Sequence, residues 1–150
     1  MYSIGYLLIC EDVVKAGNEQ TIILNPTNLI EVDELPAKIT LKLGASLIAD
    51  IREISLPYPK VEIKTVFKDP EDEVIFESNG QAFAEPPVGA DEAKSYSFVT
   101  ASVTMMFKDV EFKETGLHKV EVLINEELKK ELIFPVFEKV KSIESDENGE

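Results

Sequence analysis

The chain has 150 residues, of which 44% are hydrophobic, and its 29 acidic against 15 basic residues give a formal net charge of −14. This length and apolar content fit one globular domain with its own core and exclude a disordered chain. A surface this negative repels phosphate groups, so we expect no direct binding to nucleic acid and none to an anionic membrane. Two interpretations of the charge stay open: a well-solvated surface, or an acidic face for a basic partner, including mimicry of nucleic acid.

The N-terminal stretch MYSIGYLLICEDVV predicts a strand and no targeting segment. No basic residue precedes its apolar part, and Glu11 and Asp12 end that part early. A secretory signal and a membrane-spanning helix are therefore not expected, which favours a cytoplasmic protein. The only cysteine, Cys10, has no partner for an internal disulfide and is expected to be a small buried residue.

Three apolar runs predict strands in the first third of the chain. They are SIGYLLIC, QTIILN and PAKITLKL, residues 3–10, 20–25 and 36–43. The segment KAGNE between the first two runs predicts a turn, because Gly and Asn accept a positive φ. The third run alternates apolar and polar residues, and we expect it to continue beyond Gly44 through a β-bulge, with a short helical turn as the alternative.

The middle of the chain predicts a β-hairpin. KVEIKTVF (60–67) places Val61, Ile63, Thr65 and Phe67 on one face, with Glu62 and Lys64 on the other. The acidic stretch DPEDE (69–73) predicts a turn, because Asp-Pro starts turns, and VIFES (74–78) resumes the alternation. Before the hairpin, LPYPK (56–60) predicts a loop, because two prolines do not fit inside a sheet.

A long break and a long strand follow the hairpin. AEPPVGADEAK (84–94) holds two prolines and a glycine among charged residues, which predicts an exposed crossover. YSFVTASVTMMF (96–107) alternates and predicts a strand whose apolar face ends at Phe107. Val110 and Phe112 then take over the apolar face, so we expect a bend or corner between Phe107 and Phe112.

The C-terminal part predicts a last hairpin. Its strands are HKVEVLI (118–124) and LIFPVF (132–137), and the polar segment NEELKKE (125–131) is the expected loop between them. Pro135 lacks an N–H group, so its strand is expected at a sheet edge or with the missing donor facing solvent. Lys129 and Lys130 would guard that edge against pairing with other chains. Residues 141–150 collect acids without alternation, which predicts a disordered acidic tail.

These elements predict an all-β protein with little or no helix. About eight or nine short strands with regular turn signals are typical of an antiparallel, immunoglobulin-like β-sandwich, here as one domain over residues 1–140. The spacing of Phe112, Gly116 and His118 is similar to the corner of such sandwiches, in which a tyrosine bonds back to upstream backbone. His118 would take the place of that tyrosine, because its ring also donates one hydrogen bond.

Four stretches carry a resemblance to a known family. They are YLLICEDVV, ELPAKITLKL, VFKDPEDEVIF and FKETGLHKVEVLINEELKKELIFPV. Over residues 2–137 the chain resembles a family of small, uncharacterised bacterial and phage β-sandwich proteins, defined as a domain of unknown function, whose members tend to carry Leu-Pro-Ala, an Asp-Pro turn and a late Gly-x-Tyr. His118 stands here in place of the tyrosine, and Asp72 and Glu73 stand where a turn glycine is usual. The resemblance implies a fold and no activity.

No pattern in the chain predicts catalysis. A serine elbow and the glycine-rich phosphate motifs are absent, and the one histidine, His118, falls on a predicted strand. Folding could still bring Cys10 and His118 together, but a core cysteine and a corner histidine are the favoured interpretation. One cysteine and one histidine are too few for a transition-metal site. We therefore expect a protein that is not an enzyme and that uses no cofactor.

Carboxylates are the remaining candidates for a metal site. The acidic residues that share the hairpin turn are Asp69, Glu71, Asp72 and Glu73. Calcium prefers such oxygen ligands, and two further acidic loops, residues 31–34 and 90–92, could join them at one end of a sandwich. The spacing of a dedicated calcium loop is absent, so solvated turn residues are the favoured interpretation, and a calcium-binding or small-ligand-binding sandwich is the alternative.

The leading functional hypothesis is a non-catalytic, acidic module that acts by contact with another protein. An unguarded edge strand, with QTIILN as the candidate, could pair with a partner or with a second copy to form a homodimer. The alternative from another class is a mimic of nucleic acid that inhibits a DNA-binding protein, which requires carboxylates in a stripe on one face. The sequence does not identify the partner.

Overall fold

The computed structural model describes residues 2–17, 20–50, 52, 60–83 and 98–140. These residues form ten β-strands and no α-helix, so the expected all-β class is confirmed. The strands, in chain order, are β1 (Tyr2–Cys10), β2 (Asp12–Lys15), β3 (Thr21–Leu24), β4 (Ile30–Val32), β5 (Ala37–Asp50), β6 (Lys60–Lys68), β7 (Val74–Phe83), β8 (Phe98–Phe112), β9 (Gly116–Ile124) and β10 (Glu127–Glu138). Within the same ranges, no helix has the length and apolar character needed to cross a membrane.

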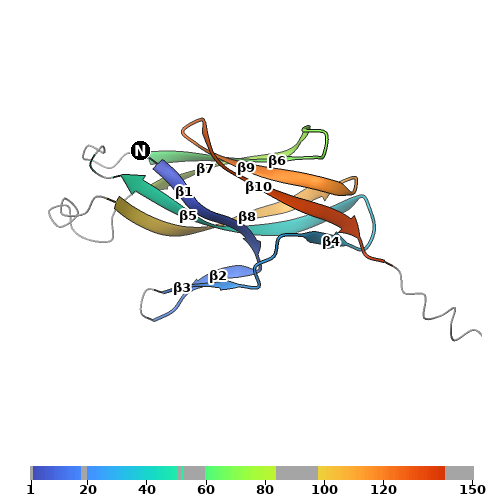
Figure 1. Cartoon of the computed structure of the whole chain (residues 1–150), viewed down its shortest axis with the longest axis horizontal. Coiled ribbons are helices and arrows are strands. Elements are labelled where there is room, and N and C mark those ends of the chain that lie inside the picture. The colour runs from blue at the N-terminus through green and yellow to red at the C-terminus, as the bar shows by residue number, and fades with distance from the viewer. Residues whose placement is uncertain (1, 18–19, 51, 53–59, 84–97, 141–150) are drawn as a thin grey trace, which may run out of the picture.

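Two sheets lie face to face, and a small hairpin is added to them (Figure 1). One sheet has the order β1-β5-β8, the other has the order β4-β10-β9-β6-β7, and β2 pairs only with β3. The pairing is antiparallel except between β4 and β10, which are parallel, so the larger sheet is mixed. Ten strands replace the expected eight or nine, because β2 and β4 have only four and three residues and are too short to show an alternation.

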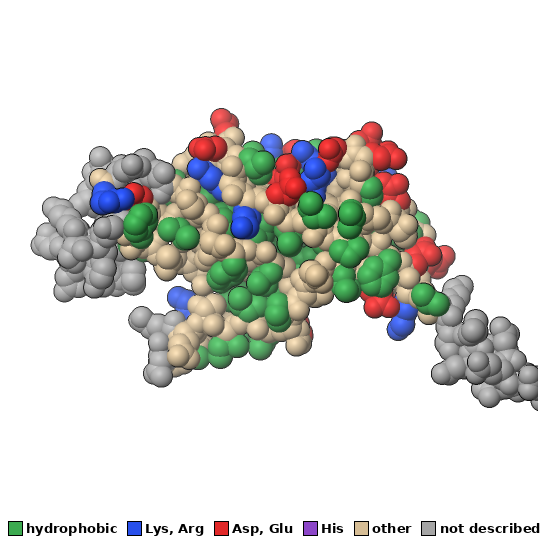
Figure 2. Space-filling view, in the orientation of Figure 1, with side chains coloured by type: hydrophobic (Ala, Val, Ile, Leu, Met, Phe, Trp, Pro, Cys, Tyr) green, Lys and Arg blue, Asp and Glu red, His purple; other side chains and the backbone are tan. Residues whose placement is uncertain are grey.

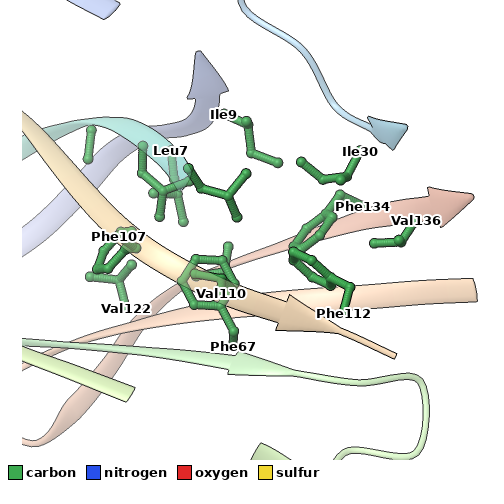
Figure 3. Packing of buried hydrophobic residues seen from close by; sticks show 14 of the residues in the cluster. Leu7, Ile9, Ile30, Phe67, Phe107, Val110, Phe112, Val122, Phe134 and Val136 are labelled. Carbon is green, nitrogen blue, oxygen red and sulfur yellow. The ribbon is translucent and has the colours of Figure 1, made fainter. Parts of the chain in front are cut away.

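The core lies between the two facing sheets and receives side chains from both. Phe107 and Val110 come from the three-stranded sheet, and Phe67 and Phe134 come from the five-stranded sheet (Figure 3). The rings of Phe67 and Phe107 meet edge to face across the interface, with centroids 5.3 Å apart. Burying each such side chain stabilises the fold by about 1.5–3 kcal/mol, so this layer is the main source of stability.

β5 is continuous through Gly44, and the bulge expected there is wrong. Leu43, Ala45 and Leu47 are all buried, so the alternation keeps its phase across the glycine. The irregularity lies in the partner strand β1, where the register shifts between Ile4 and Leu7. Gly44 instead makes room on the outer face of the sheet, because a Cβ there would lie 3.0 Å from Val13 Cγ2.

The phase slip expected after Phe107 is confirmed, and its cause is a bulge inside β8. Phe107, Val110 and Phe112 are buried, while Asp109 between them has a positive φ of 57°. The extra residue rotates the strand by one position, so the apolar residues on both sides of it reach the same core. The bend is therefore part of one 15-residue strand and not a corner between two strands.

The β6–β7 hairpin is confirmed, and Asp69 holds its turn. Asp69 Oδ1 accepts hydrogen bonds from the backbone N–H groups of Glu71 and Glu73, both at 2.9 Å. Asp72 adopts a φ of 65°, the conformation for which a glycine is usual. Aspartate tolerates this conformation better than most residues, which explains how the turn closes without glycine.

The connection between β9 and β10 is a tight turn, so the long polar loop expected at residues 125–131 is wrong. Asn125 and Glu126 have φ values of 49° and 68°, and Glu127 already pairs with Ile124. Two consecutive positive φ values form the hairpin turn that matches the twist of antiparallel strands. The polar residues after this turn belong to an exposed strand, which in sequence looks like a loop.

Pro135 lies where β10 changes its neighbours. The parallel partner β4 pairs only with Val136–Glu138, so in the part of the chain that the structure describes the preceding residues of β10 have a strand on one side only. Pro135 thus stands at the end of a free edge, and Lys129 and Lys130 stand along it. The expectation that this strand is an edge holds for its first part only.

The β2–β3 hairpin corrects the arrangement expected near the N-terminus. β3 pairs with β2 and not with β1, and the hairpin lies against the outer face of the three-stranded sheet. Thr21 Oγ1 lies 3.1 Å from Ser102 Oγ of β8. The predicted loop at 56–60, apart from Lys60, the crossover at 84–94 and the tail at 141–150 lie outside the described residues.

The aromatic contact between the sheets predicts a large effect for one substitution. Phe67→Ala should lower the free energy of unfolding by about 3–5 kcal/mol, because it leaves a cavity among Phe76, Phe107 and Phe134. Denaturant titration measures the change. Val74→Ala, at a half-exposed position of β7, is the control and should change it by less than about 0.5 kcal/mol; equal effects would contradict this description of the core.

Candidate functional site

The residues of the expected corner lie together where β8 ends and β9 begins. His118 is 1% exposed, and its ring meets Phe112 edge to face at 5.2 Å and stacks on Phe134 at 6.1 Å. Its Nδ1 lies 3.0 Å from the carbonyl oxygen of Gly116, two residues upstream. With the N–H at Nδ1 donating to that carbonyl, Nε2 is the acceptor nitrogen, and it is buried without a partner in the described structure.

Gly116 ties this corner to the turn between β6 and β7. Its φ is 127°, which side chains rarely allow, and a Cβ there would lie only 2.9 Å from Pro70 Cγ. The backbone of β9 therefore approaches the turn as closely as it does only because the residue is glycine. The arrangement holds two loops together and brings no reactive group to the surface.

The acidic turn residues are used for structure and do not gather around a metal position. Asp69 accepts the backbone bonds of the turn, and Asp72 Oδ1 lies 2.6 Å from Lys119 Nζ. Among the described residues no group of three or more Asp, Glu, His or Cys side chains has a metal-binding arrangement. The loop at 31–34 does not join the turn in such a group, and residues 90–92 lie outside the description.

Cys10 and His118 lie in different surroundings. Cys10 is buried over Gly44 on the outer side of the three-stranded sheet, with Sγ 3.4 Å from the position of a Gly44 Cβ. Burial raises the pKa of the Cys10 thiol, and the nearby Asp12 carboxylate raises it further. His118 instead contacts the core rings of the corner. A thiol with a raised pKa is a poor nucleophile at neutral pH.

On one side of the structure, β7 and β8 form the free edges of the two facing sheets. A cleft of about 330 Å³ lies between them, lined on one wall by Val103, Met105 and Phe107. The other wall includes Ser78, Gly80 and Ala82 of β7, whose small side chains leave the space unfilled. We call this region the open side. The sequence did not predict this cleft, because the expected strand ended at Ser78 and small residues at alternate positions form no apolar face.

A second hollow lies on the outer face of β7, across the strand from the cleft. It measures about 830 Å³, and the residues around it are Glu62, Lys64, Asn79, Gly80, Gln81, Leu123 and Glu126. Gly80 lines both spaces. A Cβ added at Gly80 would meet no atom within 4 Å, so neither neighbouring atoms nor an unusual φ requires glycine at this position.

Comparison with known proteins relates the chain to a family and to one solved structure. A family model described as “Family of unknown function (DUF6941)” matches residues 5–137. No curated protein matches the chain. Among solved structures, the chain is similar to the Pseudomonas fluorescens alkylpurine DNA glycosylase AlkC bound to DNA containing an abasic site analog, with 12% identity and a TM-score of 0.49. That match covers 90% of this chain and 30% of the glycosylase chain.

The corner predicts that Gly116 resists substitution. Gly116→Ala should lower the free energy of unfolding by about 1–3 kcal/mol, because alanine is strained at this φ and its Cβ meets Pro70. Gly17→Ala, where an added Cβ meets nothing within 4 Å, is the control. Thermal unfolding of both variants measures the difference, and an unchanged melting temperature for Gly116→Ala would refute the described backbone.

The ion pair beside the turn predicts a pH dependence. The hydrogen bond from Lys119 lowers the pKa of Asp72, and the same bond raises the pKa of Lys119. The lowered carboxylate pKa stabilises the fold above about pH 4, and this stabilisation is lost as the pH falls. The raised lysine pKa stabilises the fold below about pH 10, and this stabilisation is lost as the pH rises. Asp72→Asn should therefore be slightly less stable than the natural chain between these limits and equal to it outside them.

Asparagine also tolerates the positive φ of Asp72, so Asp72→Asn changes the charge and keeps the turn. Urea titrations at pH 3, 7 and 11 test the window. Glu71→Gln, in the same turn and without an ion pair in the described structure, is the matched control. A stability difference for Asp72→Asn that is the same at all three pH values would argue against the ion pair.

Proposed function

The chain belongs to this family of unknown function, DUF6941, and we propose that it is a non-catalytic module that binds another protein through its open side. The observation that carries the proposal is the free edge of β8. Its first ten residues, from Phe98 to Phe107, contain no charged residue and no proline, and β8 hydrogen-bonds to β5 alone in the described sheets. Long uncharged edges are places where a second chain can add.

Two other edges in the described structure, those of β10 and β1, are protected in ways that β8 is not. The free part of β10 carries Lys129, Lys130 and Pro135. β1 is interrupted by the register shift after Ile4, and an isolated bridge joins Ile9 to Thr27. Charge, proline and irregular backbone all discourage pairing with other chains. The contrast supports the open side as the place of contact.

The surface charge supports protein binding better than mimicry of nucleic acid. Acidic and basic side chains lie next to one another along the upper part of the molecule in Figure 2. Lys68 pairs with Glu121 at 2.7 Å, and Lys64 approaches Glu77 at 3.7 Å across neighbouring strands. Mimicry requires an unbroken row of carboxylates, whereas these lysines interrupt it. We therefore retain mimicry only as the alternative.

Two finer features belong to the same proposal. The facing sheets, the shared core and the ring at the corner support an immunoglobulin-like sandwich as the specific fold. A buried, unpaired Cys10 is compatible with a reducing compartment and supports a cytoplasmic location. The resemblance to bacterial and phage proteins supports an origin of that kind.

The proposal is tested by filling the open side. Gly80→Leu places a side chain in the cleft at a position with free space, so the fold should keep its stability. Gly17→Leu, at a second glycine with free space, is the matched control. In pull-downs from an extract of the native host, proteins retained by the natural chain and by Gly17→Leu should be lost with Gly80→Leu. The same retained proteins for all three chains would reject the proposal.

A further inference from the structure

We infer that the ligand of the open side is an extended segment of another protein in which basic and apolar residues alternate, added as a strand to the free edge of β7. The inference rests on the proposed function and specifies its ligand. Of the two free edges of the open side, it assigns the added strand to β7, because the cleft and the outer hollow both lie against β7. It draws on three features of β7: its unpaired edge, the cleft on its inner face and the acidic hollow on its outer face.

The unpaired edge of β7 determines the backbone conformation of the ligand, which must be extended. β7 bonds to β6 alone among the described strands, so the N–H and C=O groups on its other side have no strand partner there. An extended peptide offers the matching groups at the matching spacing. Glycine inside a strand often marks a close approach of another backbone, and Gly80 is a glycine that its present surroundings do not require.

The cleft determines the first kind of ligand side chain, which is apolar. Apolar residues such as Ile63, Val103, Met105 and Phe107 form the larger part of its lining, beside the polar residues Thr65, Ser78, Gln81 and Thr104, so the inner face of an added strand meets a mainly apolar wall. An apolar side chain that enters the cleft removes its own surface and that of the wall from water. A charged side chain there would lose its hydration without gaining a partner.

The outer hollow determines the second kind of ligand side chain, which is basic. Glu62, on the neighbouring strand β6, has no ion-pair partner in the described structure, whereas Lys64 approaches Glu77 at 3.7 Å. An unpaired carboxylate in a chain of net charge −14 attracts lysine and arginine and repels acids. The amides of Asn79 and Gln81 supply further acceptors at the same place.

The geometry of a strand joins the two requirements. Successive side chains point to opposite faces, so a strand beside β7 directs every second residue to the cleft and the others to the hollow. The ligand must therefore alternate apolar and basic residues. The same composition in another order would place basic groups in the cleft and apolar groups over the carboxylates.

Three fluorescein-labelled octapeptides test the inference by fluorescence anisotropy with the full chain. One alternates lysine and valine, the second has four valines followed by four lysines, and the third alternates glutamate and valine. The alternating lysine peptide should bind at least about tenfold more tightly than the other two. Glu62→Gln should weaken it about two- to fivefold, as expected for one partly exposed ion pair. Glu71→Gln, the same change in charge elsewhere, should leave its binding unchanged.

The outcomes separate this inference from the proposed function. Equal binding of the two lysine peptides, or equal effects of Glu62→Gln and Glu71→Gln, would overturn the alternating ligand while leaving the open side as a binding site. Peptide binding that Gly80→Leu does not weaken would show a ligand bound elsewhere and would also overturn the inference. A dimer in sedimentation equilibrium that Gly80→Leu dissociates would assign the edge to a second copy of the chain. Only retention of the host proteins by Gly80→Leu would reject the proposed function as well.

Discussion

The contact between the two facing sheets, with Phe67 at its centre, is the interaction on which the rest of the structure depends. Phe67 is fully buried and meets Phe76, Phe107 and Phe134 edge to face. A three-stranded or five-stranded sheet alone would expose one apolar face to water, so neither is stable without the other. The bulge at Asp109 contributes to this contact, because it directs the apolar side chains at the end of β8 into the same core layer.

The end of the molecule that holds the corner is constrained by several independent features. Gly116 lets β9 approach Pro70, the ring of His118 fills the space behind it, and Asp69 closes the turn between β6 and β7. At this corner the polar and ionisable residues stabilise the fold. The only histidine and two of the four carboxylates of the acidic turn, those of Asp69 and Asp72, are used in this way.

The open side has the opposite character, because the β7 wall of its cleft contributes little to the core. Gly80 has free space around it, and the neighbouring wall of the cleft is made of small side chains. A protein can change such positions without losing stability, so binding and folding can be studied separately there. The edge that is free of charge lies beside this cleft, whereas the edge of β10 carries Lys129 and Lys130. Protection of one edge and exposure of another is what a binding strand requires.

The sequence by itself determined the all-β class, the β6–β7 hairpin and the phase slip before Val110, because alternation along one strand is a local property. It misplaced the bulge at Gly44 and read the first part of β10 as a loop, because a bulge depends on the partner strand and an exposed polar strand has no apolar face. Only the tertiary structure decided which strands became edges and that two hollows meet at Gly80. Both result from pairing between segments far apart in the chain, and local periodicity carries no record of that pairing.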